Sequence, residues 1–143
     1  SDLAFILPQL FSEIAAPEAV WREVESSPTV DKAAQMIATV DWLKMISVNA
    51  VEEVIKWDLG SGETEVLSLA FIDREYTPVL DDMAAKKCAI SLGLQTFGTG
   101  SILILAKENG LIDSVEHSLL ELRQAGMWIS DSVIDLLKGM AGE

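Results

Sequence analysis

The chain has 143 residues, half of them hydrophobic, and its 10 basic residues are outnumbered by 23 acidic ones, which gives a net charge of −13. This length suits one domain with a sizeable core, and the apolar content excludes a disordered chain. Bulk charge disfavours binding to the phosphate backbones of DNA or RNA. A nucleic acid can still be a substrate where divalent cations or local lysines reverse the field.

Cysteine usage and the charge-free stretches bear on the compartment. Cys88 is the single cysteine, which excludes an internal disulfide and is typical of a reducing cytosol. No basic segment followed by an apolar core opens the chain, so we expect no signal peptide. Residues 88–106 carry no charge, but glycines and other turn residues interrupt the run. We therefore predict a cytoplasmic protein without a membrane span.

The first third of the chain predicts three helices and two short strands. Apolar residues recur at helical spacing over residues 3–11, and residues 13–16 suit a short strand. A helix is expected over 17–25, because its first residue is a proline, which suits a first helical turn. A third helix is expected from about residue 31, and a strand is expected within 42–48.

The stretch 60–99 has the clearest pattern. A helix opens around residues 59–65, a buried strand is expected at 77–80, a second helix at 83–92 and another strand at 94–97. Helix, strand, helix, strand at this spacing is typical of a parallel α/β sheet. Ligands of such sheets bind beyond the carboxyl ends of the strands.

Three further helices are expected in the last third of the chain. They cover residues 101–106, residues 115–126 and a segment from Ser130 or Asp131 onward. We find no internal repeat and no linker. Residues 1–143 are therefore expected to form a single domain.

Two adjacent carboxylates, Asp81 and Asp82, follow the strand predicted at 77–80 and precede a helix. Either can serve as a helix N-cap, a common use of aspartate that needs only one of them. Two carboxylates held about 4 Å apart repel each other by roughly 4 kcal/mol at an intermediate dielectric. A divalent cation would turn that repulsion into binding, so the pattern leaves both a cap and a metal site open.

Three glutamates have structural explanations beside chemical ones. Glu63 and Glu65 lie in a first helical turn, where the helix dipole stabilises a negative charge by about 0.3–1 kcal/mol. Glu63 precedes apolar positions by three, four and seven residues, so we expect it to point along the buried side of its helix. Glu23, taken alone, is typical of an ordinary surface glutamate. Lys86 and Lys87, one turn past the acidic pair, suit either a phosphate contact or a solvated helix face.

Several segments together resemble a known family. The segment Gly62-Glu63-Thr64-Glu65 before an apolar helix resembles a "GE-x-E" helix, and residues 79–87 resemble a strand followed by "DD" and small and basic residues. Residues 92–99 resemble its "LGL…GT" segment, and residues 17–24 resemble its "P-x-x-V-x-x-E" helix. These are features of a subgroup of PIN domains, small nuclease-like proteins similar to VapC-type toxins. The resemblance covers nearly the whole chain.

The resemblance implies an α/β fold, a PIN-like three-layer α/β/α arrangement with a central, mostly parallel sheet. It implies a metal-dependent ribonuclease that hydrolyses RNA phosphodiesters at a site made only of carboxylates. Carried over by position, Glu23, Glu63 and Asp82 are the catalytic acids. These three and Asp81 are the metal ligands, with Glu65 as a fallback.

The implied cofactor is Mg²⁺ or Mn²⁺, because hard oxygen ligands favour these ions. The metal would lower the pKa of a bound water and orient it for attack on the phosphodiester. The implied partners are an RNA substrate, an antitoxin protein and a second copy of the chain in a homodimer.

The sequence departs from the family at its start. PIN domains begin with a strand that ends in an aspartate, and here that strand is missing, with Asp2 falling in the predicted helical region. We expect upstream residues or another chain to supply the strand. The alternative function is a catalytically inactive PIN-like module that binds proteins. A receiver-type phospho-acceptor is a third interpretation, disfavoured because the acidic pair of receivers follows the first strand.

Overall fold

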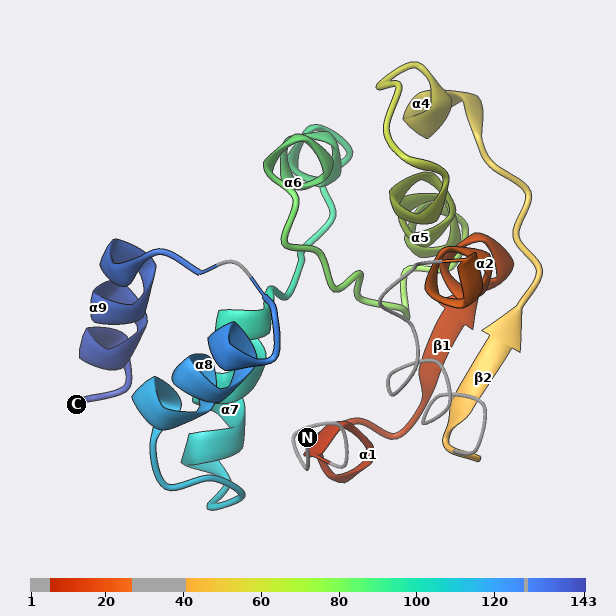
Figure 1. The fold of residues 1–143 in the computed structure, drawn as a ribbon. Coiled ribbons are helices and arrows are strands. Elements are labelled where there is room, and N and C mark those ends of the chain that lie inside the picture. The colour runs from red at the N-terminus through yellow and green to blue at the C-terminus, as the bar shows by residue number, and fades with distance from the viewer. Residues whose placement is uncertain (1–5, 27–40, 128) are drawn as a thin grey trace. The chain divides into compact units, whose positions relative to one another are not determined.

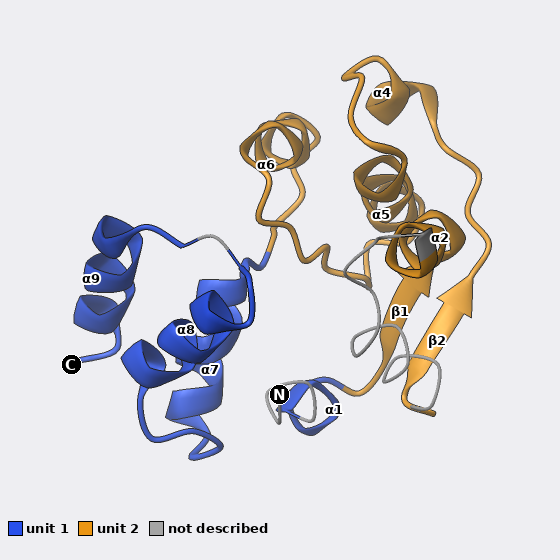
Figure 2. Cartoon of the chain, in the orientation of Figure 1, with its two compact units in different colours: residues 1–11, 97–143 blue, residues 12–96 orange. Residues whose placement is uncertain are grey.

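The computed structural model describes residues 6–26, 41–127 and 129–143 (Figure 1). Helices and one small parallel sheet make up the described part, which confirms the α/β class. The chain divides into two compact units (Figure 2). We call residues 12–96 the central unit, and residues 1–11 with 97–143 the helical unit.

The sheet of the central unit joins two strands from the first third of the chain. β1 (Ile14–Pro17) pairs in parallel with β2 (Leu43–Ile46), with Ile14 opposite Leu43. α2 (Glu18–Ser26) follows β1 directly. These three elements confirm the sequence predictions for their segments. The helix predicted from residue 31 lies outside the described residues.

A hydrogen-bonded group ties the start of β1 to its neighbours. The Tyr76 hydroxyl donates to Glu13 Oε2 at 2.6 Å, and Lys44 Nζ lies 3.3 Å from Oε1 of the same carboxylate. The hydrogen bond from Tyr76 and then the Lys44 contact lower the pKa of Glu13. The same bond raises the pKa of Tyr76 to about 12. The loop that carries Tyr76 is thereby linked to Glu13, just before β1, and through Glu13 to Lys44 on β2.

Three helices complete the central unit around one apolar core. α5 (Ser61–Ile72) and α6 (Met83–Ser91) confirm the predicted helices. The single turn α4 (Glu52–Ile55) was not predicted; the buried Ser68 hydroxyl accepts the N–H of Val51 at its start, 3.1 Å away. The buried core residues are Val54, Leu67, Ala70, Leu80, Ala85, Cys88, Ala89 and Leu94. Burial raises the pKa of the Cys88 thiol, which keeps it protonated and unreactive.

The two segments predicted as strands after α5 and α6 each shrink to a single bridging residue, Val79 and Phe97. Pro78 has no N–H, so it cannot donate to a ladder. Pro78 and Leu80 are buried while Val79 is exposed, so the segment is only partly buried. The prediction of a buried strand at 77–80 was therefore too extensive in both pairing and burial.

The helical unit packs three helices of ten residues each. They are α7 (Thr99–Glu108), α8 (Val115–Gln124) and α9 (Asp131–Met140). The single turn α1 (Leu7–Leu10) belongs to the same unit. Their buried core consists of Leu103, Val115, Leu119, Ile129 and Ile134. Gly100 lets α7 approach α9, since a Cβ at this position would lie 2.6 Å from Leu137 Cδ1. All three long helices confirm the sequence predictions.

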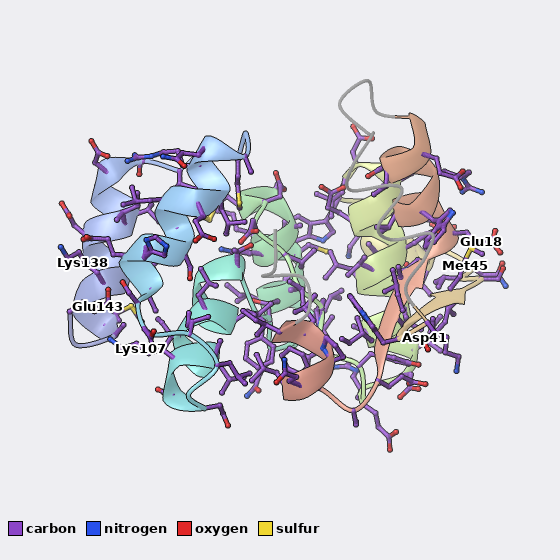
Figure 3. The ribbon with its side chains drawn as sticks, turned by 60° about the horizontal axis from the view of Figure 1, so that its bottom comes forward. Glu18, Asp41, Met45, Lys107, Lys138 and Glu143 are labelled. Carbon is purple, nitrogen blue, oxygen red and sulfur yellow. The ribbon has the colours of Figure 1, made fainter. Side chains whose placement is uncertain are left out.

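The side chain of Glu143 holds the start of α8 (Figure 3). Its carboxylate accepts the N–H groups of Val115 and Glu116, at 2.7 and 3.1 Å, and the Ser114 hydroxyl at 3.0 Å. Lys107 Nζ from α7 lies 2.9 Å from the same carboxylate. The hydrogen bond from Lys107 and those from the helix start lower the pKa of Glu143 to about 2. One carboxylate thus links α7, α8 and the segment after α9.

None of the helices in the described ranges is both long enough and apolar enough to cross a bilayer.

Candidate active site

The Glu23 carboxylate of α2 lies at the first turn of α5, the neighbouring helix in Figure 1. Its Oε1 accepts the N–H of Gly62 at 2.9 Å and the hydroxyl of Ser61 at 3.2 Å. The first N–H groups of a helix have no partner within the helix, and the helix dipole favours a negative charge there. Glu23 therefore serves as a cap for α5 that comes from another helix.

Glu65, on α5, in turn caps the amino terminus of α2. Its Oε1 accepts the N–H of Ala19, in the first turn of α2, at 3.1 Å. Arg22 of α2 lies 3.7 Å from Oε2, and the Glu65 side chain is only 17% exposed. Each helix thus supplies the carboxylate that meets the other's amino terminus. The family resemblance implied Glu65 only as a fallback ligand, and its capping of α2 was not predicted.

Glu63 lies at the same end of α5 as Glu23. A Cβ on Gly60 would come within 2.6 Å of Glu63 Oε2, and a Cβ on Gly62 would come within 2.7 Å of Glu23 Oε2. The two glycines therefore make room for the two carboxylates, which we call the acid pair. Within the described residues, no hydrogen bond or ion pair engages the Glu63 carboxylate. It is half-buried, as its place before apolar positions predicted.

An open pocket of about 520 Å³ lies beside the acid pair, within the central unit. Its lining residues are Ala19, Arg22, Glu23, Glu25 and Ser61. Arg22 is the one basic group among them, and it already faces Glu18 and Glu65 at 3.9 and 3.7 Å. The pocket thus has an acidic wall with a guanidinium at its edge. Neither Arg22 nor Ser61 was singled out from the sequence.

Asp82 is the N-cap of α6. Its Oδ2 accepts the N–H of Ala85 at 2.9 Å, the geometry of a capping aspartate. Asp81 precedes it, and both residues are exposed. Of the two explanations left open by the sequence, the structure shows the cap for Asp82.

Metal binding needs several oxygen ligands around one point. Over residues 6–26, 41–127 and 129–143, no three His, Cys, Asp or Glu side chains are placed to hold a metal ion together. The donor type suits Mg²⁺ or Mn²⁺, because every predicted ligand is a carboxylate. Of the four predicted ligands, only Glu23 and Glu63 lie together, at the first turn of α5. Asp81 and Asp82 precede α6 and do not join them in a group of three metal ligands. The described side chains do not fit a complete metal centre by themselves.

Comparison with protein families decides the relationship. A family model described as a PIN domain matches residues 2–143, nearly the entire chain. The chain belongs to the PIN-domain family. PIN domains are generally nucleases that use divalent metal ions, and membership suggests RNA binding. The comparisons with curated proteins and with solved structures found no match.

Membership confirms the PIN-like fold that the motifs at residues 17–24, 62–65 and 79–87 implied. The structure has Glu23 on α2 and Glu63 on α5. The roles of the individual carboxylates in this PIN domain stay predictions.

Proposed function

We propose that this PIN domain is a metal-dependent ribonuclease of the VapC-like toxin type. The observation that carries the proposal is the acid pair, two carboxylates from different helices at one end of α5 beside an open pocket. Glu23 is held by hydrogen bonds, whereas Glu63 is left available among the described residues. Family membership makes a nuclease the first function to test.

The proposed cofactor is Mg²⁺ or Mn²⁺, and the acid pair supplies two of its ligands. Further ligands have to come from Asp81 or Asp82 after a rearrangement, from residues outside the described ranges, or from the RNA phosphate itself. Each source predicts the same first observation. Mn²⁺ should raise the melting temperature of the wild type, because an ion that binds only the folded state stabilises it.

The central test measures cleavage of single-stranded RNA with Mg²⁺, with Mn²⁺ and with a chelator. We expect cleavage only with a divalent ion. Glu63→Gln should lose activity by about 10²-fold or more, the scale on which a removed catalytic group acts, and should melt like the wild type. The matched control is Glu108→Gln, an isosteric change at an exposed glutamate of the helical unit, which should leave cleavage unchanged.

Asp82→Asn tests whether Asp82, the third predicted catalytic acid, has a chemical role apart from capping α6. Asparagine keeps the N-cap, so the variant should fold normally, and activity then reports chemistry alone. Cleavage without any divalent ion, or wild-type activity in Glu63→Gln, would remove the support for this site.

The second candidate function is a catalytically inactive PIN domain that binds proteins. The observation favouring it is that Glu23, Glu65 and Asp82 all accept backbone hydrogen bonds at helix ends. This function would be favoured if the wild type cleaves no RNA with either ion and Mn²⁺ does not change its melting temperature.

An antitoxin protein and a second copy of the chain are the proposed protein partners, and the cytoplasm is the proposed location. Light scattering over a range of concentrations tests the homodimer, for which we expect twice the 15.5 kDa of one chain.

A further inference from the structure

The described basic residues of this acidic chain fall into two groups, those that form ion pairs with carboxylates and those that do not. Over the described residues, five of the lysines and arginines form ion pairs with carboxylates: Arg22, Lys44, Lys107, Arg123 and Lys138. The described basic residues without such a pair are Lys56, Arg74, Lys86 and Lys87. All four belong to the central unit.

One of these four cations, Lys56, lines a pocket, and Arg74 contacts another of its lining residues. The pocket has a volume of about 550 Å³ and is lined by Lys56, Trp57, Ser91 and Leu92. Arg74 Nη1 donates to the carbonyl oxygen of Leu92 at 3.5 Å, so its guanidinium stands at the rim. We call this the Trp57 pocket, and its size is that of a small-ligand site.

Lys87 and Ser91 are one turn apart on α6, so both lie on the same side of that helix. Lys56 and Ser91 of α6 line the same pocket. Burial raises the pKa of Cys88, on α6, and the positive charge of Lys56 opposes that rise.

The backbone turn after α4 carries Trp57, one of the residues that line this pocket. The Trp57 N–H donates to the Val54 carbonyl at 3.0 Å, which closes the turn. Asp58 follows with φ of 53°, a left-handed conformation that aspartate tolerates better than most residues. α4 itself ends at Ile55, and the left-handed Asp58 directly follows Trp57. The indole packs partly on the core and partly lines the pocket.

We propose that the Trp57 pocket binds one unpaired nucleotide of single-stranded RNA, with the base stacked on the Trp57 indole and neighbouring phosphates at Lys56, Arg74 and Lys87. An aromatic face flanked by cations is the arrangement that binds single strands without reading their sequence. The proposal rests on the proposed function in one respect, that RNA is the substrate. The pocket is separate from the acid pair and would hold the strand rather than cut it.

Stacking carries more of this binding than charge does. Glu52 and Glu53 lie four and three residues before Lys56, where they offset part of its positive charge. A stacked base is worth about 5- to 150-fold in affinity. The net charge of −13 opposes any long-range attraction, so we expect tight dependence on Trp57 and shallow dependence on salt.

The test is the affinity of a labelled, unstructured RNA decamer measured by fluorescence anisotropy in EDTA, where metal-dependent cleavage cannot occur. Trp57→Ala should weaken binding by about 5- to 150-fold. Trp57→Phe keeps an aromatic ring and the packing, so its RNA affinity should lie between those of the wild type and Trp57→Ala. Thermal melting of both variants checks that they fold, and Trp57→Phe keeps the test decisive where Trp57→Ala does not fold.

A pair of lysine variants tests the phosphate contact. Lys56→Gln should reduce the slope of log affinity against log salt by about 0.7, the value for one phosphate contact on a single strand. Lys44→Gln neutralises a lysine on β2 and should leave the slope unchanged. Titrating adenosine monophosphate and ribose 5-phosphate tests a free mononucleotide. Only adenosine monophosphate should quench the tryptophan fluorescence of the wild type, and Trp57→Phe should abolish that quenching.

The possible failures are distinguishable. Wild-type affinity in Trp57→Ala and Trp57→Phe, or no RNA binding by the wild type in EDTA, overturns the Trp57 pocket. RNA binding that depends on Trp57, in a wild type that cleaves nothing with either metal, leaves the pocket standing and overturns the nuclease.

Discussion

Among the residues that the structure describes, four carboxylates accept backbone hydrogen bonds at the first turn of a helix. They are Glu23, Glu65, Asp82 and Glu143. A short sequence motif marks only one of them, Asp82, because it immediately precedes its own helix. The other three cap helices that are distant in sequence. Removing any of these side chains therefore changes stability as well as local charge.

Asp82 allows the cap and the chemistry to be separated. Asp82→Ala should lower the free energy of unfolding by about 1 kcal/mol, since it leaves the Ala85 N–H without its acceptor. Asp82→Asn should lower it by much less, because asparagine caps equally well. Urea denaturation of both variants measures the difference. Equal losses would show that the cap contributes nothing in solution.

Glu143 makes the stability of the helical unit depend on pH. Its pKa falls from 4.5 to about 2 on folding, so the stabilisation is complete above pH 4.5 and is lost as the pH falls toward 2. Glu143→Gln should cost about 1–3 kcal/mol at neutral pH, the range for hydrogen bonds to a charged group. It should also flatten the acid side of the stability curve. Denaturation of both proteins from pH 7 to pH 2 tests this, and parallel curves would contradict it.

The candidate site was only partly predictable from the sequence. Glu23 and Glu63 were identified by family resemblance, and the glycines at 60 and 62 that admit their carboxylates were visible beside them. The partner of each carboxylate was not visible. The contact between Glu23 and Gly62 spans 39 residues, and no periodicity reports a contact at that separation. The Trp57 pocket was missed because it forms between α4 and α6, and α4 is too short to leave a pattern.

At the scale of elements, two glycines in neighbouring helices predict opposite effects. Gly139 lies inside α9, and a Cβ added there meets nothing within 4 Å. Gly139→Ala should therefore stabilise the protein by about 0.5–1 kcal/mol. Gly100→Ala should destabilise it by about 1 kcal/mol or more, since the new Cβ would meet Leu137 Cδ1 at 2.6 Å. Thermal denaturation of the two variants provides the comparison, and equal shifts would contradict the close approach of α7 and α9.

Helices were predicted better than strands, for a physical reason. A helix such as α8 or α9 satisfies its own hydrogen bonds, and its apolar spacing is local information. A strand needs a partner, and the apolar residues around Val79 predicted a buried strand without indicating what it would pair with. The segment of β2 was predicted as a strand because it has little helical regularity, but its parallel pairing with β1 is not encoded locally.

At the scale of the whole molecule, the family match spans the chain while the contacts divide it into two units. The sequence predicts a single domain. We therefore expect one cooperative transition in calorimetry, with equal calorimetric and van't Hoff enthalpies. Two separable transitions, one of them shifted by Glu143→Gln alone, would show that the central and helical units unfold independently.

The exchange of carboxylates between α2 and α5 links ligand binding to local order. A cation that draws Glu23 away from α5 leaves the Gly62 amide without its acceptor, and that amide should then exchange faster with deuterium in solvent. The Ala19 amide, bound to Glu65, should keep its protection. The protection of these two amides would thus report, without any substrate, whether an ion has entered the acid pair.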